Sequence, residues 1–425
     1  MKNYFDSRLK QLILALAIVL VFSTSTYSQV LLSEVTKSAH FDYKKLAQIE
    51  AEANKYVANH WLIGTSVIIV KDSKVVYYKG LGYANEASKK PMPANAIYRI
   101  MSQTKAITSL AVLQLVEQGK IGLDQKVSDF ISTFKNPKVL DHLNTNDSTY
   151  TTIPAKREIT IRDLLTHNSG IDYTDIGSDN MNAIYTKAGV PSGLGEFKES
   201  LLEKMTKLGS LPLGHQPGEK FTYGLNTDLL GCIVEIVSGT TLEKYFQKNI
   251  FDPLGMKDTY FNVPASKADR LPTVYTENEA NQIIEWSPTF RNINPNYPLV
   301  PKTYFSGGAG LSSTAYDYAI FLQMILNGGQ YNGKQIIAPR TAAIMVSPQN
   351  DRDNFGLGFG ITSEKSANLN PRNKGSFTWG GYYGTTYWAD PKDNLIVLIM
   401  TQHTPNSHGD LTGKIERIIY GSEVK

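Results

Sequence analysis

The sequence has almost no cysteine and little net charge. Cys232 is the single cysteine among 425 residues, so an internal disulfide is impossible and a hydrophobic core must hold the fold together. The 43 basic and 39 acidic side chains leave a formal net charge of +4, and they form no basic and aromatic array. This balance argues against a nucleic-acid partner. Apolar side chains make up 41% of the chain, which is ample for a large globular core.

Several common catalytic motifs are also missing. The Gly-x-Ser-x-Gly elbow of α/β-hydrolases does not occur, because Ile68 and Thr314 stand where the two nearest matches need their closing glycine. The seven histidines and the lone cysteine show no metal-ligand spacing, and there is no glycine-rich loop of the phosphate-binding type. We therefore expect no metal ion and no organic cofactor.

The first 28 residues differ from the rest of the chain. Lys2, Arg8 and Lys10 precede an uninterrupted apolar run over residues 12–22, and a small, mostly polar string continues to Ser28. This order is typical of a bacterial-type secretory signal peptide, and the run is too short to span a bilayer as a helix. We expect cleavage after Ser28 and export to the periplasm or the medium, without a permanent membrane anchor.

The two ends of the remaining chain carry similar patterns. Both show β-branched and aromatic runs separated by turn residues, and both show an amphipathic helix pattern. The predicted strands are residues 65–70, 75–78, 385–389 and 395–401, and the predicted helices are residues 41–59 and 410–419. We expect one sheet assembled from both ends of the chain.

The middle of the chain is predicted to be mostly helix and loop. Helical patterns are separated by long connections rich in Gly, Pro and Asn. They cover residues 161–166, 197–208, 227–237, 242–249 and 314–326. After the signal peptide we therefore expect one domain, 29–425, with a sheet part (about 29–120 and 305–425), a helical region (about 121–304) and the site in the cleft between them. The connection 281–304 either shapes the mouth of that site or is an ordinary surface loop.

One Ser-x-x-Lys tetrapeptide stands out among four. The pattern begins at Ser7, Ser102, Ser132 and Ser422, so the spacing alone is a weak signal. Only Ser102 opens a long helix pattern, and residues 106–116 are nearly all apolar, which indicates a buried helix. A buried Lys105 one turn away could take the serine proton and make the hydroxyl a nucleophile. The alternative is that Ser102 only caps the helix while Lys105 reaches solvent.

Five segments stand in order along the chain: Ser102-x-x-Lys105, ITIRDLLTHNSGI (159–171), PGEKFTYGLNTDLLG (217–231), SGGAGLSST (306–314) and Trp379-Gly380-Gly381. Together they resemble the serine hydrolases related to class C β-lactamases, penicillin-binding D-Ala-D-Ala peptidases and family VIII carboxylesterases. The resemblance runs from about residue 40 to the C-terminus. It implies the β-lactamase/transpeptidase-like α/β (α+β) fold, with a mainly antiparallel sheet built from both termini, flanking helices and an inserted, largely helical region.

The resemblance also implies roles for particular residues. Ser102 would be the acyl-accepting nucleophile, Lys105 would lower the cost of removing its proton, and Tyr223 would be the partner base. A neutral tyrosine is a poor base, so an ammonium such as Lys105 would have to favour the phenolate or relay the proton. The backbone N–H groups of Ser102 and Tyr382 would form the oxyanion hole.

Two departures from the β-lactamase pattern concern the substrate. Where β-lactamases carry Tyr-x-Asn, this chain has Leu225 at the third position and Asn226 one residue late. The resemblance implies that both side chains lie at the substrate, together with Trp379, Gly380, Gly381 and Tyr382, but Leu225 cannot make the amide hydrogen bond that Asn would. Trp379 replaces the lysine that would pair with a substrate carboxylate. Gly380 and Gly381 follow it in a predicted strand, where they suit close approach of a ligand or a bulge.

These departures resemble family VIII carboxylesterases, and they favour one activity over its alternatives. We expect an exported serine hydrolase that acts on carboxylic esters, with a small-molecule ester or amide as its partner. The first alternative is a β-lactamase or a D-Ala-D-Ala type peptidase. The second is a non-catalytic binder of cell wall or glycan on the same scaffold, against which the intact Ser102, Lys105 and Tyr223 argue.

Overall fold

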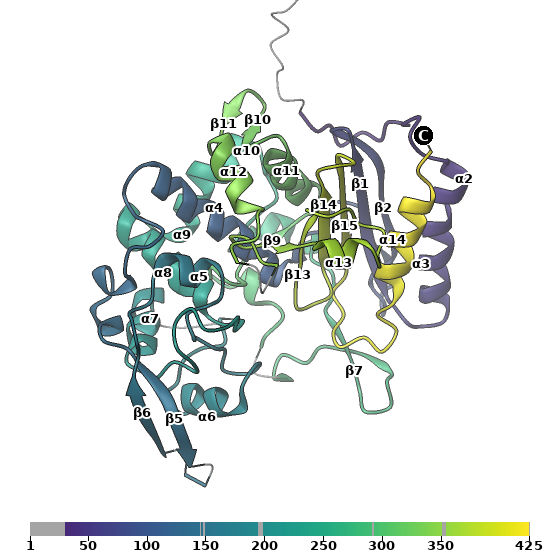
Figure 1. The fold of residues 1–425 in the computed structure, drawn as a ribbon. Helices are drawn as coiled ribbons and strands as arrows, with labels where there is room; N and C mark the ends of the chain where they lie inside the picture. The colour runs from purple at the N-terminus through teal and green to yellow at the C-terminus, as the bar shows by residue number, and fades with distance from the viewer. Residues whose placement is uncertain are drawn as a thin grey trace, which may run out of the picture.

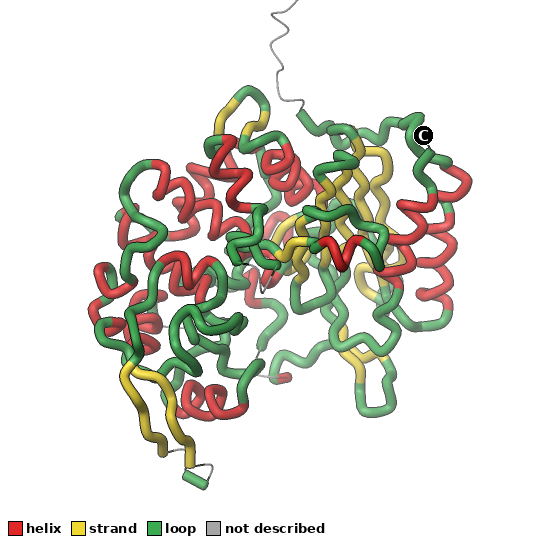
Figure 2. Tube along the Cα trace, viewed as in Figure 1, coloured by secondary structure: helices red, strands yellow, loops and turns green. Residues whose placement is uncertain are grey.

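An antiparallel sheet covered by two helices lies beside a mainly helical part (Figure 1). The structure is a computed structural model, and it describes residues 30–144, 146–147, 149–193, 199–290, 293–350 and 354–424. In Figure 2 the helices of the second part gather on the left, and a long hairpin projects from it.

The large sheet joins strands from the two ends of the chain. Its seven strands follow the order β12-β13-β14-β15-β1-β2-β3, with every neighbouring pair antiparallel. They are β1 (Gly64–Lys71), β2 (Lys74–Asn85), β3 (Lys90–Pro91), β12 (Gly360–Ile361), β13 (Phe377–Gly380), β14 (Thr386–Asp390) and β15 (Leu395–Met400). The two ends meet where β1 pairs with β15, with Ser66 opposite Met400. The predicted sheet from both ends of the chain is confirmed.

Strand β1 shows why the sheet needs cover on both faces. Its run of β-branched residues is buried on both sides, as expected for a central strand. Val67 and Ile69 pack with α3 (Gln48–Ala58) and α14 (Leu411–Gly421), whereas Ile68 and Val70 belong to the larger core shared with the helical part. The period-two alternation thus divides the apolar side chains between two cores.

Helix α4 (Thr104–Glu117), which the predicted bounds assign to the sheet part, packs within the helical part and is its buried axis. Every residue from Thr104 to Leu115 is buried, as the nearly all-apolar pattern predicts. It packs against α8 (Asn226–Ser238), which in turn packs against α5 (Ile161–Leu165), α7 (Leu201–Gly209) and α9 (Leu242–Phe246).

Shorter elements complete the fold. The other helices are α2 (Tyr43–Leu46), α6 (Asp179–Lys187), α10 (Asp252–Leu254), α11 (Ala315–Leu326), α12 (Pro339–Met345) and α13 (Glu364–Ala367). The small two-stranded pairs are β4 (Tyr98–Arg99) with β9 (Ser312–Ser313), β5 (Lys138–Asn144) with β6 (Thr149–Pro154), β7 (Tyr275–Glu277) with β8 (Ile283–Glu285), and β10 (Gln330–Tyr331) with β11 (Lys334–Gln335). The β5–β6 pair is the hairpin that projects in Figure 2.

Local capping explains where the structure departs from the predicted helix bounds. The helix predicted from residue 197 begins at Leu201, because Ser200 and Glu203 form a capping box. The helix predicted over 41–59 is divided at Ala47 into α2 and α3. The β5–β6 hairpin was not predicted, because most of its side chains are exposed and give no alternating apolar signal.

The N-terminal prediction falls outside the described part of the chain. Residues 1–28, the predicted signal peptide, are not among the described residues. Among those that are described, none of the helices has the length and apolar character needed to cross a membrane.

Candidate active site

Ser102 lies at a sharp turn between strand β4 and helix α4. After β4 pairs with β9, Met101 takes a φ of 50°, in the left-handed region that residues other than glycine rarely adopt. The turn places the partly exposed Ser102 in the wall of a pocket at the start of α4. Backbone strain of this kind is concentrated at functional sites.

Lys105 is buried one turn after Ser102. Its side chain is 2% exposed, so the interpretation in which Lys105 reaches solvent is wrong. Nζ donates to the Gly308 carbonyl oxygen at 2.9 Å, and it lies 2.8 Å from the Tyr173 hydroxyl and 3.3 Å from Ser102 Oγ. An ammonium has three N–H donors, and these three oxygens can accept all of them.

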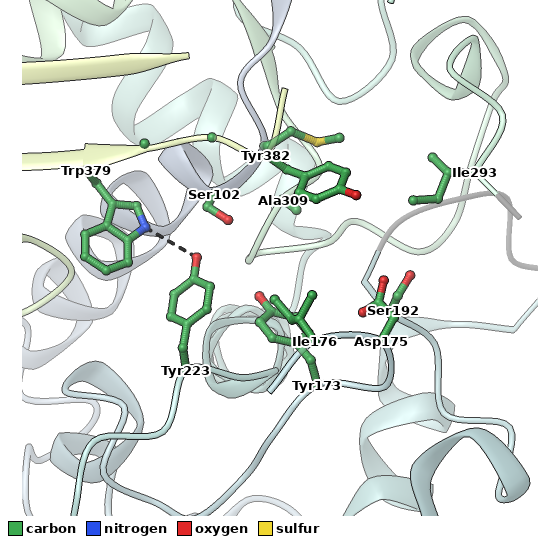
Figure 3. A pocket seen from close by; sticks show the side chains of 13 residues that line it. Ser102, Tyr173, Asp175, Ile176, Ser192, Tyr223, Ile293, Ala309, Trp379 and Tyr382 are labelled. Atoms are coloured by element: carbon green, nitrogen blue, oxygen red, sulfur yellow. Dashed lines mark hydrogen bonds between the residues drawn. The ribbon is translucent and has the colours of Figure 1, made fainter. Parts of the chain in front are cut away.

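Tyr223 and Trp379 face Ser102 across the same pocket, as Figure 3 shows. Trp379 Nε1 donates to the Tyr223 hydroxyl at 3.3 Å, and the two ring centroids are 5.5 Å apart. Lys105 Nζ lies 4.5 Å from the centroid of the Tyr223 ring. An N–H donor and a nearby ammonium both stabilise negative charge on a phenol oxygen. The arrangement can therefore support Tyr223 as a proton acceptor.

A buried polar cluster behind Tyr223 fixes the loop that carries it. Asn226, at the start of α8, accepts from the Ser169 hydroxyl and donates to His167 Nδ1 at 3.0 Å. The Thr222 N–H donates to the His167 carbonyl at 2.7 Å, and the His167 ring packs 4.9 Å from the Tyr223 ring. Burial and a nearby ammonium hold the pKa of His167 well below its ordinary value, so the imidazole is neutral.

Local sequence explains the geometry of the segment that carries His167. Helix α5 begins at a capping box in which Thr160 and Asp163 bond each other's backbone N–H groups. Arg157 donates two hydrogen bonds to the Asp163 carboxylate. The helix ends at a turn where His167 has a φ of 55° and Gly170 a φ of 88°. This turn brings the chain back toward the pocket.

The pocket has a volume of about 400 Å³ and is mostly apolar. Aromatic and aliphatic side chains make up most of its wall, and no Lys or Arg is among the described residues that line it. The lining residues are Met101, Ser102, Tyr173, Asp175, Ile176, Ser192, Tyr223, Ile293, Ala309, Trp379, Gly380, Gly381 and Tyr382. Ile293 comes from the predicted connection 281–304, so that connection contributes to the pocket wall.

Gly380 and Gly381 line the pocket beside Tyr382, but only at Gly381 would an added side chain collide with other parts of the protein. A Cβ on Gly381 would come within 2.4 Å of the Ile100 carbonyl oxygen and 2.3 Å of Thr385 Oγ1. A Cβ on Gly380 would meet its nearest atom at 3.3 Å. Gly381 therefore lets β13 approach the nucleophile segment, which is a packing requirement separate from the ligand contact expected of it.

The structure does not bring Leu225 and Asn226 into the pocket. Both side chains are fully buried, and neither lines the wall. The expectation that they contact substrate is corrected here: Leu225 is part of the core, and Asn226 ties the His167 loop to the Tyr223 loop. Their effect on the site is indirect, through the placement of Tyr223.

Tyr173 is a site residue that sequence reasoning missed. It lines the pocket, and its hydroxyl lies 2.8 Å from Lys105 Nζ. Burial raises the pKa of Tyr173 well above its ordinary value, so the hydroxyl stays neutral. It follows the segment 159–171 by only two positions, and nothing local distinguishes it among 24 tyrosines.

The described residues offer no obvious metal centre. No group of three or more His, Cys, Asp or Glu side chains that could hold a metal ion occurs within the described part of the chain. Asp175 is the one carboxylate among the lining residues that the structure describes. The wall thus offers hydroxyls, phenols, an indole N–H, the Asp175 carboxylate and backbone groups, and the Lys105 ammonium lies behind it.

Comparison with known proteins shows the family to which the chain is similar. The family model described as Beta-lactamase matches residues 47–418. The chain is 26% identical to esterase EstB of Burkholderia gladioli, over 88% of this chain and 95% of the esterase. It is 25% identical to a putative D-alanyl-D-alanine carboxypeptidase of Escherichia coli O157:H7, over 88% of this chain and 87% of that protein.

A solved structure extends the similarity to three dimensions. EstCE1, described as a hydrolase with promiscuous acyltransferase activity, superposes with a TM-score of 0.76 and 26% identity. The match covers 89% of this chain and 99% of EstCE1. The predicted β-lactamase/transpeptidase-like fold is confirmed, and the chain belongs to the Beta-lactamase family of serine hydrolases.

Proposed function

We propose that the protein hydrolyses carboxylic esters through a covalent acyl-enzyme on Ser102. The observation that carries the choice of ester is the pairing of Trp379 with Tyr223 in a pocket whose described wall has no Lys or Arg. A β-lactam or a D-Ala-D-Ala terminus carries a carboxylate, and binding it in a largely apolar wall without a cation is costly. A neutral ester brings no such charge.

The proposed first step is acylation. The Ser102 hydroxyl proton passes to Tyr223, whose phenolate is favoured by the Lys105 ammonium and the Trp379 N–H. Ser102 Oγ then forms a bond to the ester carbonyl carbon. The resulting oxyanion is stabilised by the backbone N–H groups of Ser102 and Tyr382. The C–O bond to the alcohol breaks, and the alcohol leaves with the proton held by Tyr223.

The proposed second step is hydrolysis of the acyl-enzyme. Water attacks the same carbonyl carbon while Tyr223 takes its proton. The bond to Ser102 Oγ then breaks, and the proton returns to the serine. One ester and one water give one acid and one alcohol, and the free enzyme is restored without an added cofactor.

Rates on two chromogenic substrates test this proposal. Initial rates are measured for p-nitrophenyl butyrate and for nitrocefin with wild type, Ser102→Ala and Ser132→Ala. Ser132 is the matched control because it opens another Ser-x-x-Lys tetrapeptide and is exposed. We expect a Ser102-dependent rate on the ester, little on nitrocefin, and an unchanged rate for Ser132→Ala. A faster Ser102-dependent rate on nitrocefin would make the protein a β-lactamase.

The non-catalytic binder is distinguished by covalent labelling. A fluorophosphonate adds to an activated serine and raises the mass of the intact protein. We expect one adduct on wild type and none on Ser102→Ala. An unlabelled wild type would support the binder and overturn the serine hydrolase mechanism.

We also propose that the protein is exported after removal of residues 1–28. The charged start, the short apolar run and the small residues before Gln29 support this. N-terminal sequencing of the protein recovered from a bacterial periplasm or medium would begin at Gln29. An intact Met1 in the cytoplasmic fraction alone would contradict the proposal.

A further inference from the structure

The buried ammonium of Lys105 lacks a direct ionic partner. Its near neighbours are the Ser102 and Tyr173 hydroxyls and the Gly308 carbonyl, all of them neutral. Within the described residues, no carboxylate lies within ion-pair distance of Nζ. Burying a charge without a compensating charge is unfavourable, so a source of negative potential nearby would matter to the site.

Asp228 is a buried carboxylate close to this lysine. It lies in the first turn of α8, is 1% exposed, and accepts a hydrogen bond from the Tyr304 hydroxyl on Oδ1 at 3.2 Å. Burial raises the pKa of Asp228, while Ser306, the Lys105 ammonium, Tyr304 and the Gly308 N–H oppose that rise. The catalytic scheme above leaves this carboxylate without a role.

Gly308 lies between the two charges. Its carbonyl oxygen accepts from Lys105 Nζ at 2.9 Å. A Cβ built on Gly308 would come within 2.4 Å of Asp228 Oδ2 and would lie 3.5 Å from Lys105 Nζ. The ammonium and the carboxylate therefore approach the same glycine so closely that a side chain there would collide with the carboxylate.

Neighbouring residues hold this glycine segment in place. A Cβ on Gly307 would meet the Thr227 carbonyl oxygen, in the first turn of α8, at 2.5 Å. Thr108, one turn beyond Lys105 on α4, donates from Oγ1 to the Gly307 carbonyl at 2.7 Å. The segment is therefore clamped between α4, which carries Lys105, and α8, which carries Asp228.

We propose that Asp228 is a positioning residue whose buried negative charge, acting across Gly308, holds the Lys105 ammonium beside Ser102 and Tyr223. The inference rests on the proposed function, because it assigns Asp228 a role through the lysine of that mechanism. The first turn of α8 thus has two tasks: Asn226 fixes the Tyr223 loop, and Asp228 supports the charge of Lys105.

The test removes the negative charge of residue 228 while keeping the shape of its side chain. Asp228→Asn retains an oxygen that can accept from Tyr304 but removes the negative charge. We expect kcat for p-nitrophenyl butyrate to fall about 10- to 100-fold, with KM within about twofold. Fluorophosphonate labelling of Ser102 should slow by a similar factor, because it needs the same activated hydroxyl.

A pH profile separates this role from a merely structural one. Lys105 is faced by Ser102, Tyr173 and Gly308 and by the Tyr223 ring, with neutral His167 nearby, and Asp228 is faced by Tyr304 and Ser306. Because Asp228→Asn removes a buried negative charge from the site, the alkaline limb of kcat should move to lower pH, whereas a merely structural role would leave the limb in place.

The matched control is Tyr304→Phe, which removes the hydroxyl donor to Asp228 but leaves the carboxylate. We expect a loss of less than about fivefold and an alkaline limb near that of wild type. Thermal unfolding of both variants identifies a folding defect. If Asp228→Asn folds and keeps wild-type kcat, labelling rate and alkaline limb, the proposal is overturned.

The outcomes also separate this inference from the proposed function. A wild type that is labelled but inactive on the ester would overturn the choice of substrate, while the labelling rates would still decide the role of Asp228. A wild type that is not labelled would overturn both.

Discussion

Two segments of the chain share the Ser-x-x-Lys spacing but differ in every physical respect. At Ser102 a left-handed turn leads into a buried helix, Lys105 is 2% exposed, and three oxygens surround its ammonium. At Ser132 a single 3₁₀ turn ends at Phe134, and both Ser132 and Lys135 are exposed. The spacing brings a serine and a lysine to one side of a turn in both segments. Only the buried lysine is held where it can help to activate the serine hydroxyl.

The largest expected effect contrasts the two serines. Ser102→Ala removes the nucleophile and should lower kcat for p-nitrophenyl butyrate at least ~10³-fold, with cooperative unfolding retained. Ser132→Ala should leave kcat within about twofold. A Ser102→Ala protein, purified free of contaminating esterase, that kept more than a few per cent of the rate would remove the basis of the comparison.

Substitution of the two lysines, Lys105 and Lys135, should change kcat by amounts that differ nearly as much. Lys105→Met keeps the length of the buried side chain but removes the ammonium, so we expect kcat to fall about 10²- to 10³-fold. Lys135→Met changes an exposed side chain and should alter kcat by less than twofold. Steady-state kinetics at saturating ester give both numbers, and equal effects of the two changes would contradict the importance of burial.

Replacing each of the two tyrosines beside Lys105 should show which of them acts as the base. Tyr223→Phe removes the proposed base and should cost at least ~10² in kcat. Tyr173→Phe removes one acceptor for the ammonium and should cost about tenfold, since a hydrogen bond to a charged group is worth ~1.5 kcal/mol. If Tyr223→Phe lowered kcat less than Tyr173→Phe did, Tyr173 rather than Tyr223 would be the base.

Trp379→Phe should have a smaller effect, because it keeps an aromatic ring and removes only the N–H that bonds the Tyr223 hydroxyl. We expect kcat to fall about fivefold, equivalent to ~1 kcal/mol. The ratio of ester to nitrocefin rates should stay above one. A variant that gained nitrocefin turnover would show that the indole itself excludes β-lactams.

The last expected effect concerns stability, rather than activity, as a function of pH. Folded His167 stays neutral because its pKa is well below 6.5, whereas the unfolded chain takes up a proton as the pH falls through 6.5. The free energy of unfolding should therefore fall by up to ~1.4 kcal/mol per pH unit below 6.5 from this residue. Urea unfolding of His167→Gln between pH 7.5 and 5.5 should show a shallower slope than wild type.

Much of the fold could be predicted from the sequence because its signals are local. The β-branched run of β1 and the all-apolar α4 have burial patterns that follow from their own residues. Exposed hairpins such as β5–β6 gave no apolar alternation and were missed. Helix bounds shifted where capping residues such as Ser200, rather than apolar spacing, set the first turn.

The site was only partly predictable for a related reason. Ser102, Lys105, Tyr223 and Trp379 meet as the ordered motifs imply. Tyr173 and Asp228 lie near Lys105 but belong to other segments, and no spacing within the sequence shows that they converge. Asn226 looked like a displaced substrate contact, and only its buried bonds to His167 and Ser169 reveal it as a tie between loops.

The pairing of β1 with β15 also affects how the chain can fold. The Thr65 hydroxyl donates to the Met400 carbonyl, a contact between residues 335 positions apart. The centre of the sheet is therefore closed only when nearly the whole chain has been synthesised, and such long-range pairings form slowly. Until then the edge of β1 that pairs with β15 has no strand beside it. The large sheet of such a chain stays incomplete during synthesis. An incompletely folded chain is what a translocation channel requires, if the protein is exported as proposed.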